Sequence, residues 1–171
     1  MGSLRIEKVS YFGAKYYFES EYFDKNLVLI EGDNGTGKTT FCDLIYFGLG
    51  GRVRQFLKDS DKRHSEITSD VDNYVELFIT IDGEGYNLRR YITENDITVT
   101  PYLNEVIHDV EDKEGEDKEQ QEVVSAAVQF CPLLDPESTQ VLPVNRSVNS
   151  GDTFSDWLLS QLQISVVELF Q

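Results

Sequence analysis

The chain has 171 residues, of which 15 are basic and 31 acidic, so its net charge at neutral pH is −16. This is the length of one domain or a large part of one. A content of 40% hydrophobic residues, with 10 Phe, 9 Tyr and 1 Trp, predicts a folded core rather than a disordered chain. No apolar run is long enough for a transmembrane helix, the N-terminus lacks the apolar part of a secretory signal, and the 2 cysteines exclude a disulfide framework. We therefore expect a reduced, cytoplasmic protein without membrane attachment.

The acidic excess is unevenly distributed. Residues 109–122 hold eight acidic residues and two lysines, which sum to −6, and we expect 111–122 to be a solvated acidic excursion. We interpret residues 52–73 as a basic loop, which either senses nucleotide or contacts a DNA backbone, or is simply solvated. Its basic residues are Arg52, Arg54, Lys58, Lys62 and Arg63. Net charge thus neither establishes nor excludes DNA as a partner.

The first quarter of the chain predicts strands followed by a helix. Residues 4–12 and 14–23 are rich in aromatic and aliphatic side chains and predict two strands. Residues 27–30 (LVLI) form a short apolar run, which predicts a strand buried on both faces, as in a parallel sheet. A glycine-rich loop follows, and then apolar residues recur with helical spacing up to Gly50–Gly51. These helical positions are Phe41, Leu44, Ile45 and Leu49.

From residue 74 the hydrophobic period changes to two, and residues 74–110 predict an antiparallel meander with a turn at 82–85. Residues 123–171 are expected to form helices and a loop. Within and just before them we predict a helix over 118–130, a long loop over 131–150, and a last strand over 166–170. Thr153 and Asp156 resemble a capping box, which predicts a helix from there through about Leu162.

The segment Gly32–Thr39 (GDNGTGKT) matches the P-loop pattern G-x-x-x-x-G-K-[ST]. Its glycines allow a tight wrap, in which backbone N–H groups and the helix N-terminus face a phosphate. Lys38 can bridge the β- and γ-phosphates of ATP, and the Thr39 hydroxyl suits Mg²⁺. A strand before the loop and a helix after it favour this interpretation over a turn without a ligand. The nucleotide-binding candidates are Gly32, Asp33, Asn34, Gly35, Thr36, Gly37, Lys38, Thr39 and Thr40.

The residues around the motif indicate a particular protein family more specifically than the motif itself does. Residues 27–51 (LVLIEGDNGTGKTTFCDLIYFGLGG) resemble the ABC-type ATPase heads of the SMC, SbcC and RecN/RecF families, and so does the meander over 74–92 with its paired arginines. The resemblance covers about residues 4–92. It implies an α/β P-loop NTPase fold, with a mixed sheet around the P-loop helix (4–51) and an antiparallel meander (74–110), and makes residues 4–171 the N-terminal lobe of such a head.

Several elements of a complete head are missing from the sequence. We find no Walker B strand ending in Asp-Glu, no LSGG-type signature and no switch histidine, and Glu168 stands alone. The resemblance therefore implies that a C-terminal lobe supplies these elements, and that two heads enclose Mg-ATP between them. It also implies DNA as a partner of the assembled complex, with a nuclease or accessory subunit, in DNA repair, processing or defence. On this reading the chain alone is an inactive part of an ATPase.

Four further residues have competing interpretations. Gln171 is either the glutamine that contacts Mg²⁺ and the attacking water in the resembled heads, or a plain terminal residue. Lys15 lies where related heads approach the adenine base, although a solvated strand lysine is the simpler interpretation. Arg89 and Arg90 alternate across a strand, so one faces a ligand or DNA surface while the other points inward or pairs with acids.

Two other function classes stay open. A self-contained P-loop kinase or switch would need further motifs: a GTPase needs an N-K-x-D sequence, which is absent, and a kinase needs an arginine-rich lid, whereas 109–122 is acidic. A non-catalytic module would bind nucleotide only to shape an interaction surface. Fold analogy is a weaker basis for the DNA and dimer predictions than motif chemistry is for nucleotide binding.

Overall fold

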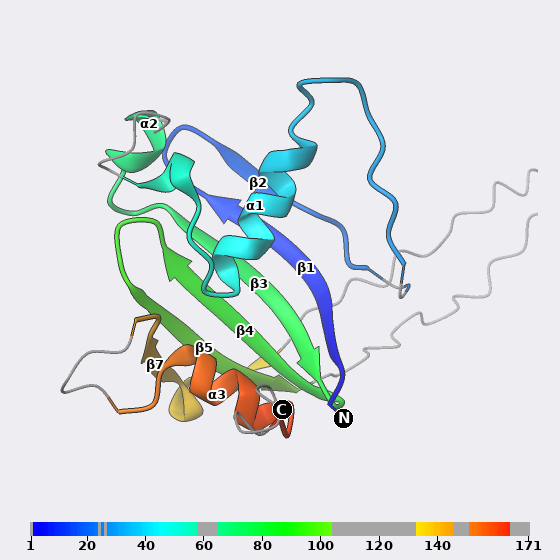
Figure 1. Ribbon diagram of the computed structural model, residues 1–171, viewed down its shortest axis with the longest axis vertical. Helices are drawn as coiled ribbons and strands as arrows, with labels where there is room; N and C mark the ends of the chain where they lie inside the picture. The colour runs from blue at the N-terminus through cyan, green and yellow to red at the C-terminus, as the bar shows by residue number, and fades with distance from the viewer. Residues whose placement is uncertain are drawn as a thin grey trace, which may run out of the picture.

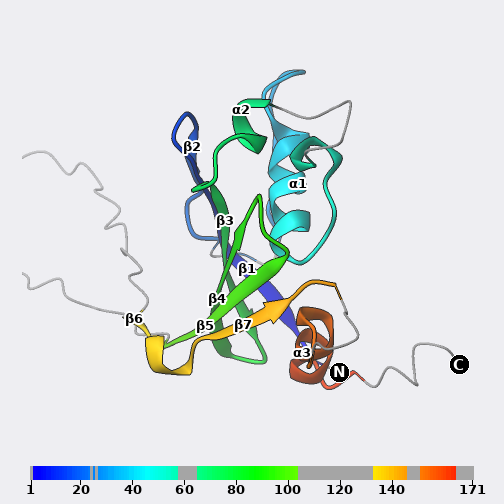
Figure 2. The same cartoon turned by 90° about the vertical axis from the view of Figure 1, so that its left-hand side faces the viewer.

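The computed structural model describes residues 2–23, 25, 27–57, 65–103, 133–145 and 151–164. These residues form one curled sheet with helices on one face (Figures 1 and 2). The strands are β1 (Leu4–Phe12), β2 (Tyr17–Glu19), β3 (Tyr74–Ile81), β4 (Glu84–Tyr91), β5 (Asp96–Leu103), β6 (Leu133–Leu134) and β7 (Gln140–Pro143). The helices are α1 (Lys38–Gly48), α2 (Ser65–Thr68) and α3 (Phe154–Gln161), with short 3₁₀ helices at Arg54–Phe56 and Pro136–Ser138.

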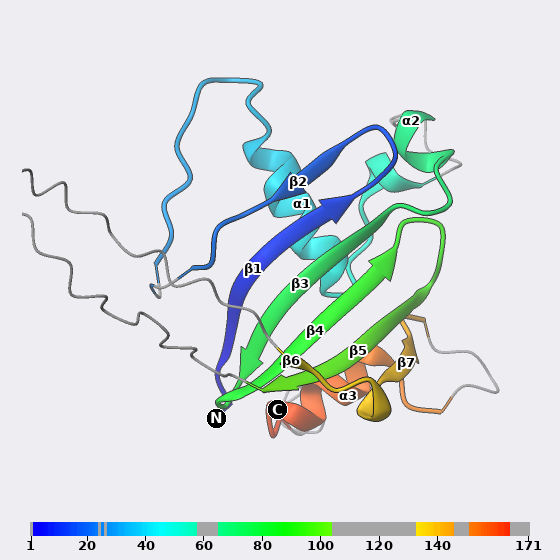
Figure 3. The same ribbon diagram turned by 180° about the vertical axis from the view of Figure 1, so that it is seen from behind.

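The strand order is β2-β1-β3-β4-β5, and both β6 and β7 pair with β5. Every pairing between described strands is antiparallel. The mixed sheet expected around the P-loop helix is therefore not what these residues form. Figure 3 shows the face of the sheet opposite to α1 and α3, which no described helix covers.

The meander forms as its period of two predicts. On β3, Val75, Leu77, Ile79 and Ile81 face the helices and are almost completely buried. The β3–β4 turn has two residues, Asp82 and Gly83, both with positive φ (50° and 93°), which is the backbone of a type I′ hairpin turn. The capping box of α3 is also present, with the Thr153 and Asp156 side chains bonded to each other's backbone N–H. α3 packs its buried Phe154 and Trp157 into the same core.

Two predicted segments need correction, and three others lie outside the described residues. Residues 27–30 form no strand: no described strand pairs with them, and they pass through solvent as an extended segment. The predicted loop over 131–150 contains β6 and β7, because its residues add to the edge of β5. The helix expected over 118–130, the acidic excursion and the strand over 166–170 lie outside the described residues. No helix in the described ranges is long and apolar enough to cross a membrane.

Helix α1 lies against the centre of the sheet, and a glycine allows this close approach. Of the predicted stripe, Leu44 is buried, while Phe41, Ile45 and Leu49 are partly buried; Phe47, which the stripe did not include, is also buried. A Cβ atom added to Gly48 would lie 2.6 Å from Cδ1 of Leu77, a side chain with no solvent exposure. The spacing between α1 and β3 therefore depends on a residue without a side chain at this position.

Replacing Gly48 with valine is expected to lower the free energy of unfolding by about 1–3 kcal/mol, because the added atoms overpack a core that cannot move aside. Urea unfolding followed by circular dichroism measures the change. Gly151→Ala is the matched control, since a Cβ atom there meets nothing within 4 Å. Equal unfolding midpoints for Gly48→Val and the wild type would contradict the close packing of α1 on β3.

Candidate functional site

The glycine-rich loop makes a tight turn just before α1. Gly35 and Gly37 have φ values of 86° and 92°, in the left-handed region that favours glycine, and both have open space where a Cβ would lie. Thr36 closes the turn, because its hydroxyl donates to the carbonyl oxygen of Asp33 (2.8 Å). The backbone of the loop is therefore exposed and bare of side-chain atoms at two of its glycines.

The N-terminus of α1 carries free backbone donors. Gly37 is the N-cap, without a side-chain cap, and no acidic residue stands in the first turn. The first helical N–H with a backbone acceptor is that of Phe41, which donates to Gly37 O (2.9 Å). Among the described residues, the N–H groups of Lys38, Thr39 and Thr40 lack a backbone acceptor. With the helix dipole, they form a positive end that is suited to a phosphate.

The Lys38 side chain is folded back over the loop. Its ammonium group donates to the carbonyl oxygens of Gly32 (2.6 Å) and Asp33 (2.7 Å). Both acceptors are neutral and exposed, and no carboxylate of the described residues forms an ion pair with Lys38. The positive charge is thus held at the loop without being neutralised.

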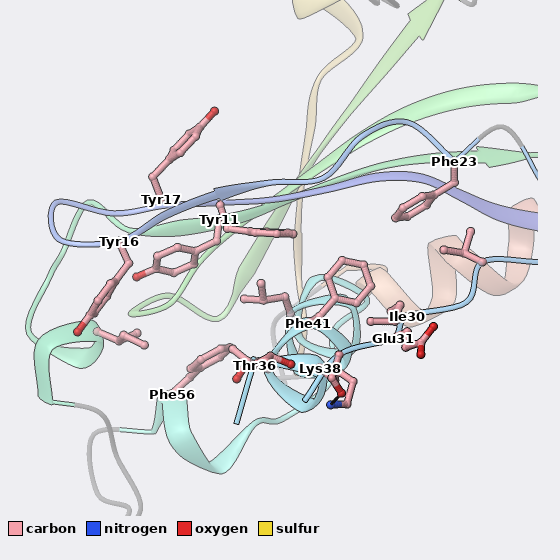
Figure 4. Close-up of a pocket in the computed structure, with 17 residues that line it drawn as sticks. Tyr11, Tyr16, Tyr17, Phe23, Ile30, Glu31, Thr36, Lys38, Phe41 and Phe56 are labelled. Atoms are coloured by element: carbon pink, nitrogen blue, oxygen red, sulfur yellow. Dashed lines mark hydrogen bonds between the residues drawn. The ribbon is translucent and has the colours of Figure 1, made fainter. Parts of the chain in front are cut away.

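A cavity of about 660 Å³ opens beside the loop, between α1 and the β1–β2 hairpin (Figure 4). Its wall is largely aromatic, and Figure 4 shows Tyr11, Tyr16, Phe41 and Phe56 turned toward it while Tyr17 points away. The Tyr16 hydroxyl donates to Glu66 on α2 (3.2 Å), which ties the hairpin to α2 at the rim of the cavity. Hydrogen bonds lower the pKa of Glu66, first from its own backbone N–H and then from Ser65. This carboxyl is therefore ionised at neutral pH.

The apolar segment 27–30 borders the cavity on one side only. Val28 and Ile30 line the cavity and are 45% and 41% exposed, whereas Leu27 and Leu29 point away from it and are 86% and 85% exposed. This alternation is that of a β-strand. The segment therefore has the side-chain pattern of a strand, with one face turned to the cavity and the other to solvent.

Gly32 through Thr40 lie on one continuous loop and helix N-terminus. Lys15 is exposed beside this site; its ammonium group lies 5.3 Å from the centre of the Tyr16 ring, but it does not line the cavity. Gln171 lies outside the described residues. The aromatic wall was missed at the sequence level, although the density of Tyr and Phe over residues 11–23 could have indicated it.

A metal ion would find few protein ligands here. The described ranges contain no group of three or more His, Cys, Asp or Glu side chains placed to hold a metal. Thr39 is exposed at the start of α1, and its hydroxyl forms no hydrogen bond among the described residues. The site can therefore offer the Thr39 hydroxyl, at a helix N-terminus that already favours phosphate, which is the donor that Mg²⁺ takes from a P-loop.

Comparison with known proteins gives one family and one distant relative. The sequence matches the AAA domain family over residues 3–148, most of the chain. It is also similar to the chromosome condensation protein dpy-27 of Caenorhabditis elegans, with 28% identity over an alignment of 119 residues; the match covers 61% of this chain and 8% of that protein. No solved structure matches the chain significantly.

The family match implies a P-loop NTPase and an ATPase-type, nucleotide-binding domain, in agreement with the loop geometry. The chain spans only a small part of its relative, so the match concerns this domain and not the activity of the whole relative. The two comparisons also agree with the resemblance predicted from residues 27–51 and 74–92. The chain belongs to the AAA domain family, as the N-terminal region of an SMC- or SbcC-like ATPase.

Proposed function

We propose that the chain binds Mg-ATP through residues 32–40 and forms the nucleotide-binding half of an ATPase head in the cytoplasm. One observation carries the proposal: an uncapped helix N-terminus, with unpaired N–H groups on Lys38, Thr39 and Thr40, follows a loop that two left-handed glycines keep open. Such a site favours a phosphate chain over other ligands, because its donors and its positive dipole converge on one place.

The residues fit a nucleoside triphosphate. The free N–H groups of the loop and helix would surround the β-phosphate, and Thr39 would hold Mg²⁺. Lys38 would exchange its two bonds to Gly32 O and Asp33 O for phosphate oxygens, a charge-assisted contact that is stronger than one to a neutral carbonyl. The aromatic wall formed by Tyr16, Phe41 and others offers ring faces to the base. ATP itself supplies the phosphoryl group that an ATPase transfers to water.

A second lobe is needed to complete this site. The extended segment 27–30 turns Leu27 and Leu29 into solvent, and an apolar strand of this kind is expected to be buried on both faces. We propose that the C-terminal lobe of the same head covers these residues and brings the acidic residues for hydrolysis, which this chain lacks. Burial of the segment would join the two halves at the edge where the P-loop begins.

DNA is the proposed partner of the assembled head. The distant relative is a chromosome condensation protein, and the resembled families act on DNA with paired heads. We accordingly propose that two heads enclose the nucleotide, and that hydrolysis separates them during DNA repair, processing or defence. A nuclease or accessory subunit would act through this complex rather than through the lobe alone.

Calorimetry with the chain tests the nucleotide proposal. ATP with Mg²⁺ is expected to bind at least tenfold more tightly than AMP, because only ATP carries the phosphates that the loop would hold. Equal affinities would remove the P-loop from the binding site. The same preparation is expected to show no appreciable ATP hydrolysis. Robust hydrolysis by residues 1–171 alone would instead indicate a self-contained P-loop enzyme and would overturn the two-lobe proposal.

A further inference from the structure

Three arginines of the sheet provide an internal comparison. Arg5 donates to Glu7 through Nε and Nη2, at 2.8 Å in each case. Arg89 donates to Glu76 through the same two atoms, at 3.2 and 2.9 Å. In both pairs the Nε/Nη2 edge of the guanidinium binds a carboxylate, which is the geometry that suits a planar donor fork.

Arg90 is the exception. Its Nη1 donates to the carbonyl oxygens of Phe47 (2.7 Å) and Gly51 (2.8 Å) at the end of α1, and its guanidinium lies 3.9 Å from the centre of the Phe47 ring. The side chain is buried, with 6% of its surface exposed, and Nε has no hydrogen-bond partner among the described residues. The one edge that the other two arginines give to a carboxylate is therefore unused in Arg90.

This arginine lines a cavity of about 310 Å³ at the C-terminal end of α1, which shares Phe56 with the P-loop cavity. Apolar side chains form part of the wall, from Phe47, Val53, Phe56, Leu57, Ile92 and Val144. Polar side chains complete it, from Arg52, Arg90, Glu94, Asn95 and Asn145. No ion pair between described residues includes Arg90, so Glu94 does not neutralise it. A buried cation without a counter-charge is costly, and a bound anion would remove that cost.

We propose that this cavity binds a carboxylate, held by the unused Nε/Nη2 edge of Arg90, with an apolar body against Phe56 and Ile92. The wall favours a carboxylate over a phosphate, because Glu94 repels a dianion more strongly than a monoanion. The carboxylate belongs either to a small organic acid or to an acidic side chain of a protein segment. Neither source depends on nucleotide binding at the P-loop.

Burial also affects the titration of this group. Desolvation lowers the pKa of Arg90 to about 10. The group remains protonated at neutral pH, so it is available to a carboxylate under ordinary conditions. A carboxylate at the Nε/Nη2 edge would raise that pKa again, because it favours the charged form.

Nuclear magnetic resonance of the Arg90 Nε–H group tests the proposal directly. Titration of the full chain with sodium butyrate at constant ionic strength is expected to shift this resonance and to saturate, whereas butyramide, which has the same shape without the charge, is expected to leave it unchanged. Equal shifts with both compounds would mean that binding depends on the apolar body and not on the carboxylate, and this would overturn the proposal.

Two substitutions keep the test independent of folding. Glu94→Gln removes an acidic group from the wall and is expected to tighten butyrate binding by about two- to fivefold, the size of one partly exposed charge contact. Glu84→Gln, an exposed change on β4 outside the cavity, is expected to have no effect. Unaltered affinity in Glu94→Gln would contradict binding of an anion in this cavity.

The same resonance distinguishes the two sources of the carboxylate. If the natural ligand is a small organic acid, the Nε–H chemical shift of the ligand-free chain is that of a group without a hydrogen bond. A protein side chain gives the value of a hydrogen-bonded Nε–H before any addition. An unbonded shift that does not respond to butyrate would overturn the proposal for both sources.

Discussion

Replacing Lys38 with alanine is expected to weaken ATP binding at least 100-fold. The ammonium group is the one side-chain cation that the P-loop holds in place, and it is bonded only to the neutral oxygens of Gly32 and Asp33. Contacts of a cation with phosphate are charge-assisted hydrogen bonds, each contributing about 1.5–3 kcal/mol, and the loss of two of them accounts for a change of this size. Isothermal titration calorimetry with Mg-ATP measures it.

The control for this experiment is another exposed lysine. Lys25→Ala removes the same charge away from the loop and is expected to leave the affinity within twofold of the wild type. Lys38→Arg keeps the charge but not the compact ammonium, and is expected to lie between wild type and alanine. Binding of ATP to Lys38→Ala with wild-type affinity would remove the P-loop assignment altogether.

Replacing Leu29 with aspartate is expected to abolish association with the C-terminal lobe without affecting the stability of the chain itself. Leu29 is 85% exposed, so a charge there costs nothing in the isolated domain. In the assembled head the same position would be buried, and the variant would lose the transfer free energy of a leucine, about 1.5–3 kcal/mol, and would bury an unpaired carboxylate besides. Together these effects predict an association at least 100-fold weaker.

Co-purification of the two lobes and urea unfolding of this one measure the two quantities separately. Val71→Asp is the matched control, because Val71 is also exposed (67%) but lies before β3, away from the 27–30 segment. Both variants are expected to unfold at the wild-type urea concentration, and only Leu29→Asp is expected to lose its partner. Normal association of Leu29→Asp would show that the second lobe docks elsewhere.

The parts of the fold that could be predicted are those determined by residues close together in the sequence. The period of two over β3 placed Val75 and Leu77 on the buried face, and the Asp82–Gly83 pair placed the turn. The capping box at Thr153 placed the start of α3 for the same reason, since a cap acts over three residues. The P-loop residues also came together, because one continuous segment contains them.

The parts that could not be predicted depend on distant segments. The run over 27–30 indicates burial, but it does not say which chain provides the cover, and no described strand does. The direction of strand pairing and the addition of β6 and β7 to β5 are also long-range choices, and here they give antiparallel ladders. Arg89 and Arg90 were expected on opposite faces of the sheet, and they are. Their hydrogen-bond acceptors, Glu76 and Phe47, belong to other elements and could not be predicted from the two arginines alone.

The exposed segment 27–30 has a consequence for the solubility of the chain. The segment has four adjacent aliphatic side chains in extended backbone, with no charge or proline among them. Exposed sequences of this kind promote aggregation between separate molecules. The net charge of −16 opposes this, since molecules of the same sign repel one another. That repulsion weakens as salt shortens its range, to about 8 Å at physiological ionic strength. Added salt therefore favours self-association of the lobe, whereas a second lobe seated on Leu27 and Leu29 would protect it.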